Sequence, residues 1–190
     1  MAENTSKDRY KIKETFTMSV EKINMYAIMF LFPLLLFFSL PYVLIWSFDV
    51  FKTGFSDFIG WKLLPVILGG ILIHEGLHGL ALVILTKGKN RVIFGFNKEL
   101  LAPYAHFKGP VRAWQYMIIS ALPGVVLGLY PLIYSLINGN TYFHFFGLLF
   151  TWSAAGDLFS IIAISRYPFQ TIVRDHPDTL GFYVLEENTE

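Results

Sequence analysis

Four stretches of this chain are apolar over the length of a membrane-spanning helix, and they constrain its fold more than any other feature. They cover residues 25–46, 61–86, 114–137 and 142–164. Crossing the hydrocarbon core of a bilayer as a helix takes roughly 20 apolar residues. Composition agrees, because only 15% of the residues are charged, whereas soluble domains carry about 25%. We therefore predict an all-α polytopic membrane protein with about four transmembrane helices.

Polar segments flank the apolar region at both ends. We predict a cytoplasmic N-terminal tail over residues 1–24, a single membrane domain over 25–165 and a cytoplasmic C-terminal tail over 166–190. A signal peptide would reach its apolar run sooner and end it at a small-residue cleavage site. Here the run begins near Met25 and continues through bulky residues to Trp46, which indicates a retained membrane anchor.

Lysine and arginine are distributed unevenly among the segments between the spans, and this predicts the orientation. The N-terminal tail, the second connection and the C-terminal tail are basic, whereas the first connection offers only Lys52 and Lys62 and the third offers none. Segments rich in these residues remain in the cytoplasm. With four spans the basic segments all lie on one side, so we expect both termini in the cytoplasm and the protein in the plasma membrane.

The second connection, residues 88–110, is too long for a tight turn. Residues 91–96 and 104–107 are rich in strand-forming side chains, with Asn97, Lys98, Glu99 and Pro103 between them. This pattern favours a short β-hairpin at the cytoplasmic face. An irregular interfacial loop with aromatic anchors would fit the same residues.

His74, Glu75 and His78 lie in the middle of the second apolar stretch, in the order His74-Glu75-Gly76-Leu77-His78. Residues four apart share one face of a helix, so both histidines can face one metal ion. Glu75 lies beside that face, where it can reach a metal-bound water. Ionisable groups within a membrane span cost a few kcal/mol each, about 2.5–3.5 on insertion scales, unless they are paired or hydrated. We predict a zinc site, with a polar cluster without metal as the alternative.

A catalytic zinc site needs a third protein ligand and an open position for water. Asp157 is the only acidic residue in the fourth stretch. His78 and Asp157 lie at similar depths, roughly 12 and 10 Å from the cytoplasmic ends of their spans by helical rise. The chain has small residues around Asp157 and has Gly69, Gly70, Gly76 and Gly79 on the second stretch; these would allow the helices to approach closely. A His–Asp pair without metal is the alternative.

The other histidines suggest no chemistry. His144, at the start of the fourth stretch, and His106, in the second connection, are more readily explained as solvated or interfacial side chains than as ligands. His176 lies in Arg174-Asp175-His176-Pro177-Asp178, which is typical of a turn or cap. The chain has no cysteine, which excludes disulfides and thiolate ligands.

His74-Glu75-x-x-His78 in a membrane helix, followed by a later span with Asp157, resembles the site-2 protease class of intramembrane metalloproteases. More closely, the chain is similar to the putative zincin peptidase family of small bacterial membrane proteins. The similarity includes Ala155-Gly156-Asp157-Leu158 and a tail with Asp175-His176-Pro177-Asp178. It implies His74, His78 and Asp157 as ligands of one Zn²⁺ ion and Glu75 as catalytic base.

These features together predict a zinc metallopeptidase that hydrolyses peptide bonds in or near a membrane span, with zinc-activated water and Glu75 as general base. Its partners would be the lipid bilayer and a membrane-protein or peptide substrate. A formal net charge of +1 gives no indication of nucleic-acid binding. The alternative function is a non-proteolytic metal-binding or scaffold membrane protein that retains the zincin fold.

Overall fold

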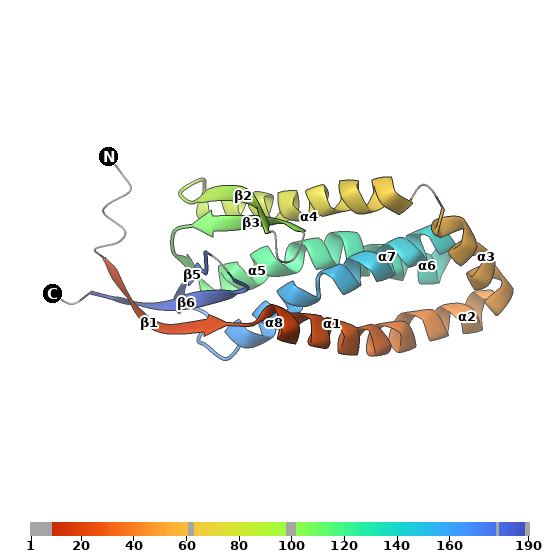
Figure 1. Cartoon of the computed structure of the whole chain (residues 1–190), viewed down its shortest axis with the longest axis horizontal. Helices are drawn as coiled ribbons and strands as arrows, with labels where there is room; N and C mark the ends of the chain where they lie inside the picture. The colour runs from red at the N-terminus through yellow and green to blue at the C-terminus, as the bar shows by residue number, and fades with distance from the viewer. Residues whose placement is uncertain (1–8, 61–62, 98–101, 178, 189–190) are drawn as a thin grey trace. The chain divides into compact units, whose positions relative to one another are not determined.

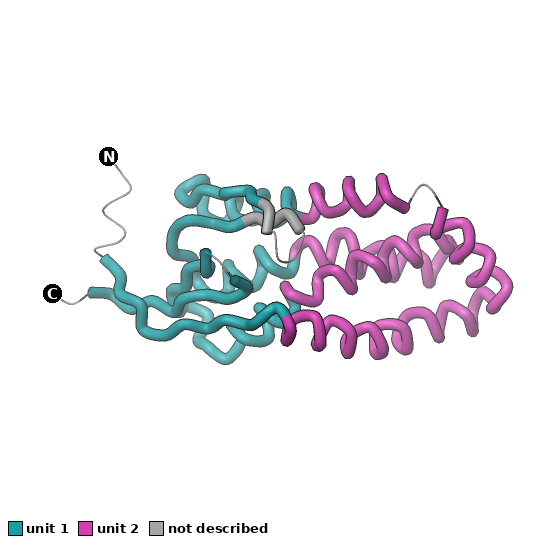
Figure 2. Tube along the Cα trace, in the orientation of Figure 1, with its two compact units in different colours: residues 1–20, 75–121, 158–190 teal, residues 21–74, 122–157 magenta. Residues whose placement is uncertain are grey.

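The computed structural model describes residues 9–60, 63–97, 102–177 and 179–188. It is mostly helical and also contains antiparallel β-structure (Figure 1). The chain divides into two compact units (Figure 2). Unit 1 comprises residues 1–20, 75–121 and 158–190, and unit 2 comprises 21–74 and 122–157. Each division between the units falls inside a continuous helix.

Among the described residues, three helical segments are long and apolar enough to cross a membrane: Val20–Trp46, Leu63–Thr86 and Ala113–Asn138. A fourth candidate is a bent pair, α7 (Thr141–Ser153) and α8 (Ala155–Ile164), whose axes differ by 48°. These segments match the four predicted stretches closely. Trp61 and Lys62, at the predicted start of the second stretch, lie outside the described residues.

The first and third candidate spans each contain a π-helical segment shortly before a proline. In the first, π-helix η1 (Leu35–Ser39) separates α1 (Val20–Leu34) from α2 (Leu40–Trp46), with Pro41 at the start of α2. In the third, η2 (Gly124–Leu129) separates α5 (Ala113–Pro123) from α6 (Tyr130–Asn138) and precedes Pro131. A proline ring clashes with the carbonyl four residues earlier, and the wider π-helical turn gives that carbonyl more room. Both irregularities therefore follow from the sequence.

Unit 2 is a helical bundle that buries phenylalanine and leucine. Its core cluster is formed by Leu34, Phe58, Leu132, Phe145 and Leu148. Helix α3 (Phe48–Phe58) was not predicted; its capping residue Ser47 accepts a 3.4 Å hydrogen bond from the Val50 N–H.

Glycines bring the helices of unit 2 together. Helix α4 (Leu63–Thr86) meets α7 at Gly70, where an added Cβ would fall on the ring of Phe150. Gly69, by contrast, has nothing within 4 Å of a Cβ. The prediction that glycines permit close helix approach is therefore confirmed for Gly70 and wrong for Gly69 and for Gly76, which also has nothing within 4 Å of a Cβ.

Unit 1 contains a four-stranded sheet in the order β1-β6-β5-β4, which the prediction of an all-α protein missed. Its strands are β1 (Tyr10–Thr17), β4 (Val111–Arg112), β5 (Ile172–Asp175) and β6 (Gly181–Glu187). Strands β1 and β6 come from opposite ends of the chain and pair antiparallel, with Tyr10 opposite Glu187. Val173 and Phe182 are fully buried, so the sheet has a core of its own. Sequence analysis missed this sheet because most of its strands lie in the polar tails and pair with segments far away in the chain.

The predicted β-hairpin is confirmed. Strand β2 (Arg91–Asn97) pairs antiparallel with β3 (Ala102–Lys108), and Arg91 lies opposite Lys108. The Asn90 side chain donates a 3.0 Å hydrogen bond to the Pro110 carbonyl and closes the base of the hairpin. A Cβ at Gly79 of α4 would lie 3.3 Å from the Phe94 ring. Gly79 therefore lets the hairpin lie close to α4.

Candidate metal centre

The two histidines of the sequence motif lie on the same continuous helix. His74 and His78 both belong to α4, and their spacing of four residues places them one above the other on one face. Glu75, next to His74, is partly buried. The placement of His74 and His78 on one face therefore depends only on local helix geometry.

Asp157 lies next to His74. The Nε2–H of His74 donates a hydrogen bond of 3.1 Å to Oδ2 of Asp157. The two side chains are 12% and 20% exposed, respectively. Asp157 is in the first turn of α8, where a negative charge is favoured by the helix dipole. The fold thus brings Asp157, which sequence analysis grouped with the two histidines, next to His74.

His74, His78 and Asp157 form a group that could hold a metal ion, because one potential ligand atom from each lies within 4.8 Å of the others. Two imidazoles and a carboxylate are a donor set found at catalytic zinc sites. The His74–Asp157 separation of 3.1 Å is close to the edge of a zinc tetrahedron, about 3.3 Å for bonds of 2.0–2.1 Å. The donor types and the His74–Asp157 separation therefore fit zinc, and all three ligand atoms lie within 4.8 Å of one another.

His78 has an additional partner in unit 1. Its Nδ1–H donates a 2.8 Å hydrogen bond to the carbonyl oxygen of Ile119 in α5. Sequence analysis did not anticipate this contact. One residue in the sequence could have indicated it. Pro123 lies four residues after Ile119, and because proline has no N–H it cannot donate to the Ile119 carbonyl.

The remaining histidines have other roles. His144 is fully buried, so the expectation of a solvated or interfacial side chain was wrong. The Nδ1–H of His106 donates a 2.8 Å hydrogen bond to Asp175, and only 13% of the His106 side chain is exposed. This bond joins the hairpin to β5. His176 accepts a 3.3 Å hydrogen bond from the Thr179 N–H, which confirms the predicted turn.

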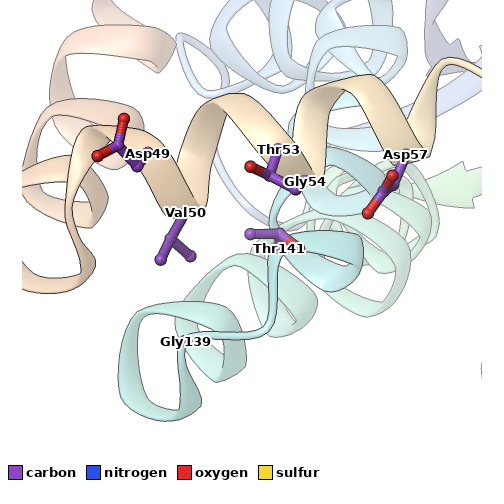
Figure 3. Close-up of a pocket in the computed structure, with 7 residues that line it drawn as sticks. All are labelled: Asp49, Val50, Thr53, Gly54, Asp57, Gly139 and Thr141. Carbon is purple, nitrogen blue, oxygen red and sulfur yellow. The ribbon is translucent and has the colours of Figure 1, made fainter.

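An open hollow of about 380 Å³ lies elsewhere in unit 2, between α3 and the segment that joins α6 to α7 (Figure 3). Its lining includes the carboxylates of Asp49 and Asp57 but no histidine. Gly54 of α3 lies against Thr141 at this place, where an added Cβ would clash with the threonine side chain. The hollow is therefore a feature of helix packing distinct from the His–Asp group.

A protein-family profile described as "Putative zincin peptidase" matches residues 67–172, which is more than half of the chain. The chain belongs to this family. The matched region includes His74, Glu75, His78 and Asp157. Membership in a zincin family and the His–Asp group together suggest a metallopeptidase with a zinc cofactor.

Neither the comparison with curated proteins nor the comparison with solved structures found a match. The family match does not test the predicted resemblance to site-2 proteases. That part of the predicted resemblance remains a prediction.

Proposed function

We propose that the chain is a membrane-embedded zinc metallopeptidase in which His74, His78 and Asp157 hold one zinc ion and Glu75 is the general base. One observation supports this proposal above all. Two histidines and a carboxylate lie within 4.8 Å of one another, on helices otherwise apolar enough to cross a membrane. Burying ionisable groups at such a depth is costly, and shared ligation of a cation offsets that cost. The proposed location is the plasma membrane, with both termini in the cytoplasm.

The chemistry assigns a different task to each side chain. Zinc, when bound, polarises a carbonyl and lowers the pKa of a coordinated water. The Glu75 carboxylate accepts a proton from the attacking water and delivers it to the leaving amine. Asp157 supplies a negative charge to the ligand set, and its Oδ2 lies 3.1 Å from Nε2 of His74, so both atoms could bind the same ion in place of the hydrogen bond between them.

The proposed substrate is a peptide bond in or beside a membrane span of another protein. A helical segment hides its peptide carbonyls, so the substrate would have to unwind locally. Among the described residues β2 pairs only with β3, and an extended peptide can add to such an edge by backbone hydrogen bonds. Phe94 of β2 packs at Gly79, the residue after His78, so this edge is close to the proposed ligands along α4.

Two variants test the proposal together. Glu75→Gln keeps the size of the side chain but cannot accept the proton, so zinc should remain bound while cleavage falls roughly 10²–10⁴-fold. His74→Ala should lose both zinc and cleavage. Zinc content of the purified protein and cleavage of candidate single-span substrates in reconstituted vesicles measure both effects.

His176→Ala is the matched control, because His176 accepts a bond within its own turn and should retain zinc and activity. If Glu75→Gln cleaves as fast as the wild type, Glu75 is not the base. If zinc binds but no substrate is cleaved, the non-proteolytic scaffold becomes the better explanation. Absence of zinc from the wild type would contradict the ligand set itself.

A further inference from the structure

The Ile119 carbonyl lies at a place where helix α5 cannot complete its own hydrogen bonding. In an α-helix the N–H of a residue donates to the carbonyl four residues earlier. The residue four positions after Ile119 is Pro123, and proline has no N–H. Pro123 is fully buried and Ile119 is 2% exposed, so water is a poor substitute for the missing donor.

His78 supplies the donor that the helix lacks. Its Nδ1 lies 2.8 Å from the Ile119 oxygen. A carbonyl oxygen only accepts, so the proton of this bond resides on Nδ1. In a neutral imidazole the other nitrogen, Nε2, then keeps its lone pair. The contact therefore selects one tautomer and holds the plane of the ring.

We propose that Pro123 acts as a positioning residue for metal binding, because it frees the Ile119 carbonyl to hold His78 in the tautomer that binds metal through Nε2. This inference rests on the proposed function for the identity of the ligands. Hydrogen bonds from the second nitrogen of a ligating histidine commonly fix its tautomer and orientation. Here the acceptor is a backbone carbonyl that a single proline makes available.

Pro123→Ala tests the inference in the full-length protein. Alanine restores an N–H that competes for the Ile119 carbonyl, so the affinity for Co²⁺, used as a spectroscopic probe for zinc, should fall about 10–100-fold. Pro131→Ala is the matched control, because Pro131 is also buried and lies in the same candidate span but is not four residues after Ile119. Absorption titration of detergent-solubilised protein measures both affinities.

The tautomer provides a readout that needs no metal. In ¹⁵N NMR spectra of metal-free protein, His78 should be protonated on Nδ1 alone in the wild type and in Pro131→Ala. Pro123→Ala should show a mixture of tautomers. The chain has five histidines, so a His78→Asn sample identifies the resonance.

A second variant keeps the test decisive if Pro123→Ala disturbs the fold. Replacing His78 by Nδ1-methylhistidine removes the donor and leaves Nε2 intact, so Co²⁺ affinity should fall by a similar factor. Unchanged affinity in this variant, an equal loss in Pro131→Ala, or a wild-type His78 protonated on Nε2 would each overturn the inference. A wild type that binds no Co²⁺ but shows the Nδ1–H tautomer would contradict the proposed function and leave the positioning contact established.

Discussion

His144 shows how a single buried imidazole can have all its hydrogen bonds satisfied by hydroxyl groups. The Ser135 hydroxyl donates to the Leu132 carbonyl at 2.7 Å, so its oxygen accepts the Nδ1–H of His144 at 3.1 Å. Nε2 is then an acceptor, and the Ser39 hydroxyl donates to it at 3.1 Å. The Tyr42 ring covers the imidazole with a centroid separation of 4.2 Å. This network joins η1, α6 and α7 and explains why a histidine is tolerated in an apolar bundle.

Ser39→Ala should destabilise unit 2 because it leaves Nε2 of His144 buried without a donor. We expect a loss of about 0.5–2 kcal/mol in the free energy of unfolding, measured by denaturant or thermal unfolding in detergent. Ser165→Ala is the control, since that exposed hydroxyl donates within its own turn, to the Ile162 carbonyl, and its loss should cost less. Equal stability of Ser39→Ala and the wild type would show that the network contributes nothing.

At the scale of helices, one close contact is relevant to how the site is assembled. Gly70 lies one turn before His74 on α4, and the Phe150 ring occupies the space that a side chain at Gly70 would need. Phe150 is 2% exposed and belongs to α7, which leads through a bend at Ala154 into the helix that carries Asp157. The contact between α4 and α7 therefore helps to bring His74 and Asp157 together.

Gly70→Ala should separate α4 from α7 and destabilise the protein by about 1–3 kcal/mol, the usual cost of overpacking. Zinc affinity should fall as well, because the distance between His74 and Asp157 depends on this contact. Gly69→Ala is a close control: its Cβ meets nothing within 4 Å, and alanine favours a helix over glycine by roughly 0.5–1 kcal/mol. Unfolding curves and zinc titrations compare the two. Equal behaviour of the variants would show that the contact does not position the site.

At the scale of the whole chain, the distribution of basic residues and the secondary structure agree. Strands β1, β5 and β6 and the β2–β3 hairpin all belong to unit 1, and all lie in segments that the basic residues assign to the cytoplasm. Backbone hydrogen bonds between strands need no apolar surroundings, whereas open sheet edges do not occur in lipid. The strands are therefore expected outside the bilayer, which is consistent with the proposed orientation.

Because the chain has no cysteine, single cysteines can report its topology. Lys13→Cys in β1 should be protected from a membrane-impermeant thiol reagent in intact cells, and Ser56→Cys in α3 should be labelled. Both positions are exposed in the structure, so accessibility to the reagent depends on the side of the membrane. Permeabilised cells provide the control, in which both variants should react. The reverse pattern in intact cells would contradict the proposed orientation.

The sequence alone determined the features that depend on local geometry. Apolar length located the candidate spans, a spacing of four residues placed His74 and His78 on one helix face, and strand-forming residues located the hairpin. Only the tertiary structure decided which distant groups meet. Asp157 reaches His74, the Ile119 carbonyl accepts from His78, and β1 pairs with β6 near the other end of the chain. Such contacts depend on packing between segments far apart in the chain, which no short-range pattern of residues specifies.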